Sequence, residues 1–274
     1  MNFRVSRLDL KRFFQSFRWI SAVLLFFMAT PGFSLSAEGE TPGVEAPDAD
    51  TIVEKSFRHM RGDASESRVR MTIHRPDWER TMLLRVWTRG ETESLIRIEE
   101  PARDAGNGTL KVGTEMWMYN PKVNRVIKVP PSMMSQSWMG SDFSNNDLAR
   151  SDSLLRDYDH ELAGSETRNG MTAYRIVSTP RPAAPVVWGK QEMAIREDHI
   201  LLEQIFFDED MVEVKRMTTG DIAERDGRLF PGTMRMVKAD APAEYTLMEY
   251  LEIEFLDTLP DRYFTRSALQ TPRR

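Results

Sequence analysis

The sequence contains no cysteine and only four histidines in 274 residues. Without cysteine, the protein can form neither disulfide bonds nor a thiolate nucleophile. This composition fits a reducing cytoplasm, or a bacterial periplasmic protein that does without disulfides. The histidines are His59, His74, His160 and His199, and their spacing gives neither an HExxH nor an HxH pattern. We therefore expect no metal site.

The common catalytic and nucleotide-binding motifs are also missing. No GxSxG, P-loop or GxGxxG pattern is present, and these patterns supply the turns that position a nucleophile or a phosphate. The acidic run at residues 208–210 is too short to supply the oxygen ligands that calcium needs. We expect no catalytic residues and no cofactor. One enzyme alternative stays open, a hydrolase in which a serine of residues 132–144 acts with His160 or His199.

Positive charge is scarce for a nucleic-acid-binding protein. The formal net charge is -5, and residues 1–37 hold five basic residues and one acidic residue. The remainder then has 32 basic and 41 acidic residues, a net charge of -9. Binding to phosphate backbones requires clustered lysine and arginine. We therefore expect no nucleic-acid partner.

The N-terminus has the layout of a secretory signal peptide. Basic residues up to Arg18 precede an apolar run at residues 19–29, and Pro31 and Gly32 follow it. Small residues then lead to Ala37, after which we expect cleavage. The apolar run is short beside the roughly 20 residues that span a bilayer, although an uncleaved anchor remains the alternative. The sequence thus predicts a signal peptide at residues 1–37 and a periplasmic location.

Beyond the signal peptide, we expect a flexible leader and then one domain. Residues 38–49 are acidic and rich in proline and glycine, which is typical of a flexible leader. A helix is predicted next, with Asp50 or Thr51 as its N-cap and Gly62 at its end. The domain is predicted to cover residues 50–270.

Most of this domain is predicted to be strands. Val69, Met71 and Ile73 alternate with polar residues, and similar runs recur between short turns as far as residue 256. Alternation with period two and short turns indicate an antiparallel meander. No strand–helix–strand alternation is present, so a parallel sheet is not expected. We predict a mainly β protein of about 11–13 strands with a few short helices.

Residues 130–156 interrupt the strand pattern. This serine-rich stretch contains five large apolar residues, Met133, Met134, Trp138, Met139 and Phe143. Asn145 or Asn146 is predicted to cap a short helix that continues to Leu155. Long loops inside a domain are functional or disordered, and the apolar content argues against disorder. We expect this stretch and the helix near residue 55 to cover the apolar face of the sheet.

Several motifs, in this order, resemble those of the outer membrane lipoprotein-sorting protein family, which belongs to the LolA-like superfamily. The matching segments are Met116-Trp117-Met118-Tyr119-Asn120-Pro121, Arg125-Val126-Ile127, Ser141-Asp142-Phe143-Ser144, Trp188-Gly189-Lys190, residues 203–208 with Val214-Lys215, residues 226–231 with Met234-Arg235-Met236, and residues 259–265. The resemblance covers residues 50–270. It implies a strongly curved antiparallel sheet, an incomplete barrel, whose concave face is covered by helices.

The resemblance also implies a function. A member of this family would carry lipoproteins or other lipids across the periplasm, in outer membrane biogenesis, with the acyl chains in a hydrophobic cavity. It would work as a monomer with an RND-type inner-membrane transporter or a lipoprotein export complex. This chain is longer than the short carriers, which leaves the cargo open among a lipoprotein, a phospholipid, a hopanoid and another apolar molecule. The alternative within the superfamily is a periplasmic lipid-sensing signalling module.

The candidate ligand-binding residues are large and apolar. An apolar loop must bury itself against something, and the concave face of the sheet is the large apolar surface available. We expect one cavity wall from the loop and the opposite wall from the sheet. The predicted set is Met133, Met134, Trp138, Met139 and Phe143 of the loop with Trp87, Trp117 and Phe206 of the sheet. Strand 116–119 is apolar on both faces, so its register decides which residues face the ligand.

Overall fold

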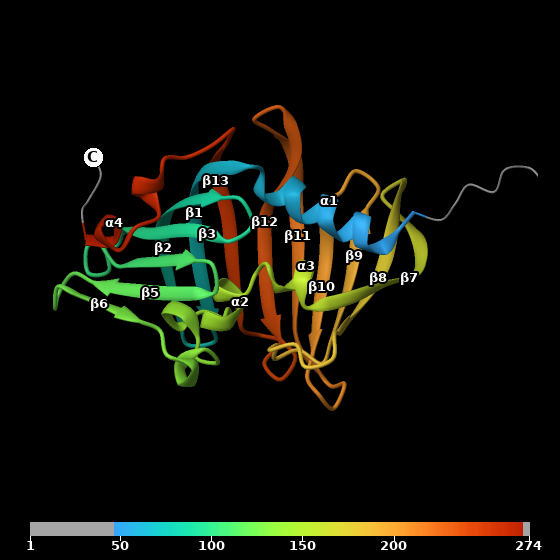
Figure 1. The fold of residues 1–274 in the computed structure, drawn as a ribbon, viewed down its shortest axis with the longest axis horizontal. Helices are drawn as coiled ribbons and strands as arrows, with labels where there is room; N and C mark the ends of the chain where they lie inside the picture. The colour runs from blue at the N-terminus through green and yellow to red at the C-terminus, as the bar shows by residue number, and fades with distance from the viewer. Residues whose placement is uncertain (1–46, 271–274) are drawn as a thin grey trace, which may run out of the picture. The chain divides into compact units, whose positions relative to one another are not determined.

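A computed structural model describes residues 47–270, and the strands in this range form one antiparallel sheet (Figure 1). Its order is β6-β5-β4-β3-β2-β1-β13-β12-β11-β10-β9-β8-β7. The strands are β1 Ala64–Arg75, β2 Trp78–Arg89, β3 Glu93–Glu100, β4 Gly108–Val112, β5 Glu115–Asn120, β6 Arg125–Lys128, β7 Tyr158–Arg168, β8 Met171–Pro180, β9 Lys190–Arg196, β10 Leu201–Phe207, β11 Glu213–Arg225, β12 Arg228–Lys238 and β13 Tyr245–Leu256. The predicted mainly β class and strand number are confirmed. The predicted signal peptide and most of the predicted leader lie outside the described residues.

The sheet consists of two meanders joined at its centre. Strands β1 to β6 run outward to one edge, and β7 to β13 run inward from the other edge until β13 pairs with β1. Met71 of β1 lies opposite Met82 of β2 on one side and Met248 of β13 on the other. Because β6 and β7 are the two edges, the chain between them must cross the sheet. Residues 129–157, the crossing segment, make this connection.

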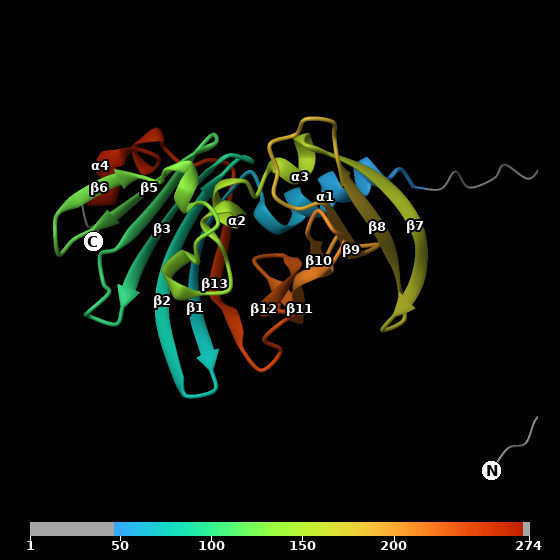
Figure 2. The same cartoon turned by 90° about the horizontal axis from the view of Figure 1, so that it is seen from below.

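The crossing segment contains short helical turns and no strand. These are η1 Pro131–Met133, η2 Trp138–Gly140, α2 Asn145–Ala149 and α3 Ser153–Arg156. Figure 2 shows the sheet bent around α2, α3 and the N-terminal helix α1. The prediction that an asparagine caps α2 is wrong, because Ser144 forms a reciprocal capping box with Asp147. Asn145 lies in the first turn, and its side-chain amide donates to the Met133 carbonyl at 2.9 Å.

Helix α1, Ala49–Arg61, lies on the same side of the sheet. The predicted cap at Asp50 or Thr51 is also wrong. The Asp48 carboxylate accepts from the Thr51 backbone N–H at 2.9 Å and from its hydroxyl at 2.7 Å, so Asp48 is the N-cap. Gly62 ends the helix as predicted, with φ 68°, a backbone conformation that glycine adopts without steric cost.

Both faces of the sheet are covered where β2 to β5 pair. On the concave face, Met71, Met82 and Met116 pack with Trp138 of the crossing segment. The opposite face is covered by the C-terminal segment, which contains η3 Asp261–Tyr263 and α4 Arg266–Gln270. The strand apolar on both faces, β5, is therefore packed on both sides, with Met116 buried and Trp117 partly buried. No helix among residues 47–270 is long and apolar enough to cross a membrane.

Candidate ligand-binding cavity

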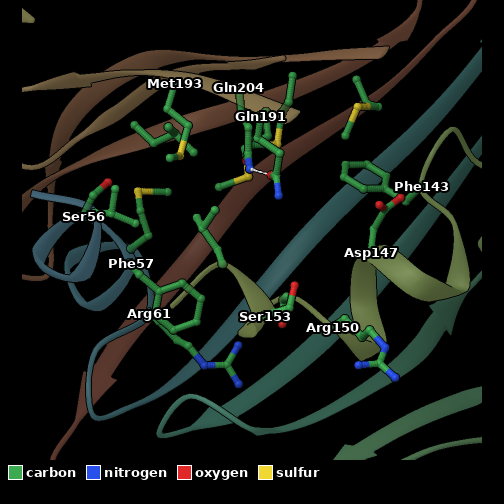
Figure 3. A pocket seen from close by; sticks show the side chains of 18 of the residues that line it. Ser56, Phe57, Arg61, Phe143, Asp147, Arg150, Ser153, Gln191, Met193 and Gln204 are labelled. Atoms are coloured by element: carbon green, nitrogen blue, oxygen red, sulfur yellow. Dashed lines mark hydrogen bonds between the residues drawn. The ribbon is translucent and has the colours of Figure 1, made fainter. Parts of the chain in front are cut away.

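A cavity of about 320 Å³ lies between the concave face of the sheet, α1 and the crossing segment (Figure 3). Its lining combines a large apolar surface with a smaller polar one. The lining residues are Val53, Ser56, Phe57, Met60, Arg61, Ser65, Ser67, Val86, Thr88, Phe143, Asn146, Asp147, Arg150, Ser151, Ser153, Leu154, Trp188, Gln191, Met193, Ile195, Leu201, Gln204, Phe206, Met217, Met234, Met236, Tyr250 and Ile253. This volume lies at the lower end of the roughly 300–1,000 Å³ typical of small-molecule sites.

The floor of the cavity is a methionine-rich part of β9 to β12. Met193, Gln204, Met217 and Met236 are cross-strand partners in consecutive strands. Because side chains alternate between the faces of a strand, this pairing places all four on the concave face. Methionine is flexible and adapts to ligands of different shape. The floor can therefore accommodate an irregular apolar ligand.

A second row contains aromatic and polar groups. Phe206 lies opposite Gln191 on one side and Lys215 on the other. The Phe206 ring centre is 5.3 Å from that of Trp188. Gln204 donates to Gln191 across the floor at 2.7 Å, as Figure 3 shows. The two amides thus share one hydrogen bond beside the methionines of the floor.

The roof comes from two parts of the chain. Helix α1 contributes Val53, Phe57 and Met60, which follow one another at helical spacing. The crossing segment adds Phe143 and Leu154. The roof is therefore made of short elements, and its position depends on what holds the crossing segment in place.

Three aspartates hold the crossing segment to three strands. Asp142 pairs with Arg75, with Oδ1 2.9 Å and Oδ2 3.2 Å from the two guanidinium nitrogens. Asp147 pairs with Lys215 of β11. Asp152 has one oxygen 2.9 Å from Nζ of Lys111 in β4, whose side chain is 2% exposed. The aspartates are five residues apart, and each meets a cation that lies far away in the sequence.

The two arginines of the lining lie on one side of the cavity. Figure 3 shows Arg61, Ser153 and Arg150 on one side of the cavity and Met193, Gln191 and Gln204 on the other. The Arg61 guanidinium donates to the backbone carbonyls of Gly90 and Glu93, the latter at 2.5 Å. Removal from water lowers the pKa of Arg61 to about 10, so it stays charged at neutral pH.

The histidines have other neighbours. His160 contacts the Ser178 hydroxyl at 2.7 Å and the Leu154 carbonyl at 3.0 Å, and burial lowers its pKa. Ser178 belongs to β8 and not to residues 132–144, where the hydrolase alternative places its nucleophile. His59 contacts the Leu229 carbonyl at 2.7 Å. Among residues 47–270, no group of histidines and carboxylates is arranged to hold a metal ion.

The eight predicted site residues are divided among three environments. Phe143 and Phe206 line the cavity. Met133, Met134, Trp138 and Met139 pack in the neighbouring core on the concave face, where the indole N–H of Trp138 donates to Thr109 at 3.0 Å. Trp87 and Trp117 lie on the opposite face, against the C-terminal segment. Whether any of the eight contacts a ligand stays a prediction.

Sequence reasoning missed most of the lining. The methionines of β9 to β12 were visible in the alternation of Met234 and Met236, but nothing in the sequence placed β9 beside α1. The polar side was missed because serines and arginines in separate segments carry no common pattern. The regular spacing of Asp142, Asp147 and Asp152 was a signal that could have indicated where the crossing segment forms ion pairs with the sheet.

Comparison with known proteins supports the fold. A family model described as an uncharacterized protein matches residues 90–271, more than half of the chain. The structure is similar to a DUF1329 family protein from Desulfovibrio piger, with 24% identity and a TM-score of 0.72, covering 81% of this chain and 97% of that chain. No curated protein sequence matches.

Two further structures are similar. An outer membrane lipoprotein-sorting protein domain from Vibrio parahaemolyticus is 19% identical, with a TM-score of 0.70, covering 81% of this chain and 98% of that chain. A LolA superfamily protein from Nitrosomonas europaea is 22% identical, with a TM-score of 0.68, covering 81% of this chain and all of that chain (100%). The LolA-like fold inferred from the sequence motifs is confirmed.

Proposed function

We propose that this chain, which belongs to the family whose model matches residues 90–271 and has the LolA-like fold, is a periplasmic carrier of lipids or lipoproteins. The observation that carries the proposal is the cavity between the methionine-rich floor and the roof. A buried methylene group gains about 0.8 kcal/mol on leaving water. Transfer of an acyl chain from water into this cavity is therefore favourable.

The similar fold of a domain described as lipoprotein-sorting supports a carrier over an enzyme. The cargo is a lipoprotein, a phospholipid or another apolar molecule. An RND-type transporter or a lipoprotein export complex would deliver it or take it away. Such a carrier has to admit and release its ligand, and the crossing segment is the part of the roof suited to move. Around the cavity it is attached to the sheet by the ion pairs of Asp142, Asp147 and Asp152, while Trp138 and its neighbours pack in the adjacent core.

The test is native mass spectrometry with lipid extraction of protein purified from the periplasm. We expect a co-purified lipid in the wild type. Met234→Trp replaces a lining side chain with a larger apolar one, which reduces the free volume of the cavity, and we expect it to remove the lipid without unfolding the protein. Leu251→Trp makes a comparable change at an exposed position of β13 and serves as the matched control. A folded Met234→Trp variant with unchanged lipid content would overturn the cavity assignment.

A further inference from the structure

We propose that the ligand of this cavity is an amphiphile with an anionic head group, a carboxylate or a phosphate, and that Arg61 and Arg150 bind it. This inference rests on the proposed function, since it assumes that the apolar part of the ligand occupies the cavity. The observation behind it is the presence of two arginines on one side of a cavity whose lining is mainly apolar.

Neither arginine has a carboxylate partner within ion-pair distance among the described residues. Arg61 uses two of its N–H groups on backbone carbonyls, which leaves further donors of its guanidinium available. Arg150 has no side-chain hydrogen bond or ion pair within residues 47–270, although it is half-buried. A half-buried cation without a counter-charge is a costly arrangement unless a ligand supplies the charge.

The carboxylates whose charge acts on Arg61 are each paired with another cation. Asp152 is 2.9 Å from Lys111 and 2.7 Å from Arg156. Glu93 is 2.6 Å from Arg89, and Glu91 is 3.5 Å from Arg58. Their negative charge is therefore largely compensated elsewhere, and it does not neutralise the arginines.

The one carboxylate in the lining is compensated too. Asp147 is paired with Lys215, whose ammonium group lies over the rings of Trp188 and Phe206, 4.8 and 5.0 Å from their centres. With this pair counted as neutral, Arg61 and Arg150 leave the cavity positively charged. Because a low-dielectric wall strengthens the field of such charges, the cavity favours an anion over a neutral head group.

Small hydroxyl side chains add further hydrogen-bond donors to the lining. Ser56, Ser153 and Ser67 line the cavity and are buried or nearly so, while Ser151 is exposed beside Arg150. Hydroxyl groups can donate to carboxylate or phosphate oxygens. The arginine fork and these donors match the acceptors of either anion, which defines the class of ligand and leaves its source to experiment.

The experiment measures the dissociation constants of four single-chain probes for the full mature protein. Oleate and oleoyl lysophosphatidate carry the two anions, oleyl alcohol is the neutral match, and oleoyl lysophosphatidylcholine is the zwitterionic match. We expect at least one anionic probe to bind about tenfold more tightly than its match, because a charge-assisted hydrogen bond contributes of the order of one factor of ten. A preference for oleate points to a fatty acid, and a preference for lysophosphatidate points to a phospholipid source.

The decisive variant is Arg150→Gln, which removes the charge without disturbing the carbonyl contacts of Arg61. We expect it to abolish most of the preference for the anionic probe and to leave the affinity for oleyl alcohol unchanged. Arg150→Lys should restore part of that preference. Arg125→Gln, at an exposed position of β6, is the charge-matched control.

Two outcomes overturn the proposal, and they are distinguishable. Equal binding of anionic and matched probes to the wild type, or an unchanged preference in Arg150→Gln, would refute the anionic head group while the hydrophobic cavity stands. Failure of all four probes to bind would refute the proposed carrier function together with this inference.

Discussion

Lys215 of β11 and Asp147 of the crossing segment form an ion pair inside the protein, with side chains only 4% and 11% exposed. The pair joins the roof of the cavity to its floor. Asp147 lies in the lining on the roof side, and Lys215 lies beside Phe206 of the floor. Burial lowers the pKa of Lys215, and the Asp147 carboxylate opposes that shift. The lysine thus depends on its partner for its charge, and the roof depends on the lysine for its position.

Lys215→Met is expected to lower the free energy of unfolding by about 3–5 kcal/mol, since it leaves a largely buried carboxylate without its partner. Urea denaturation measures this change. Lys128→Met is the matched control, because Lys128 and Glu115 form an exposed pair and such pairs contribute about 1 kcal/mol or less. Equal losses in the two variants would show that the Asp147–Lys215 pair does not hold the roof.

Trp138→Phe is expected to reduce stability and leave ligand binding unchanged. The indole is buried in the core beside the cavity, and its loss as a donor leaves the Thr109 hydroxyl without this partner, at a cost of about 1–3 kcal/mol. Urea denaturation and native mass spectrometry of the same sample give the two readouts. Loss of the bound lipid at full stability would instead place Trp138 at the ligand, as the sequence predicted.

His160 is expected to make stability depend on pH near neutrality. Burial lowers its folded-state pKa below the ordinary value of 6.5, with Asp50 opposing and Arg181 reinforcing the shift. The unfolded chain therefore takes up the proton first as the pH falls. The contribution of the neutral ring to stability is complete above 6.5 and decreases as the pH falls from there towards the folded-state pKa.

The measurement for His160 compares urea midpoints at about pH 7.5 and about pH 5.5, a window that contains the ordinary histidine pKa. His160→Gln keeps a polar side chain and removes the titration. We expect the wild type to lose more stability than His160→Gln between these two conditions. Equal losses would mean that another group, such as His199, whose pKa is also lowered by burial, dominates this window.

Export with cleavage after Ala37 is expected from the basic residues and apolar run of the first 37 residues. N-terminal sequencing of protein from the periplasmic fraction should begin at Glu38. Leu24→Arg with Leu25→Arg would interrupt the apolar run and should keep the protein in the cytoplasm. A periplasmic protein that still begins at Met1 would refute cleavage.

The strands were predictable because their information is local. Alternation in β1, with Val69, Met71 and Ile73 on one face, reports burial on one side of a strand whatever its neighbours are. The turns between strands are short and carry their own residue signals. The end of α1 at Gly62 was predictable for the same reason, since a positive φ at a helix end favours glycine whatever the rest of the fold is.

The sites of capping and the facing of β5 were not predictable in the same way. Asp48, Asp50 and Thr51 are all acceptable N-caps by residue type, and the helix start depends on which of them the packing of α1 places at its end. In β5, Met116 and Trp117 are both large and apolar. Periodicity cannot choose between faces when both are buried, and the choice was made by the C-terminal segment that packs against Trp117.

The sequence by itself determined that residues 130–156 form an apolar excursion that must be buried, because exposing its methionines and aromatics to water is costly. Only the tertiary structure decided where. The pairing of β1 with β13 puts β6 and β7 at opposite edges, so the crossing segment has to span the concave face. That long-range pairing places residues more than 170 positions apart, such as Arg70 and Glu249, opposite each other in neighbouring strands, and it brings Arg61 and Arg150 into the lining of one cavity. No local sequence pattern encodes this pairing, because the two strands that contact each other are far apart in the sequence.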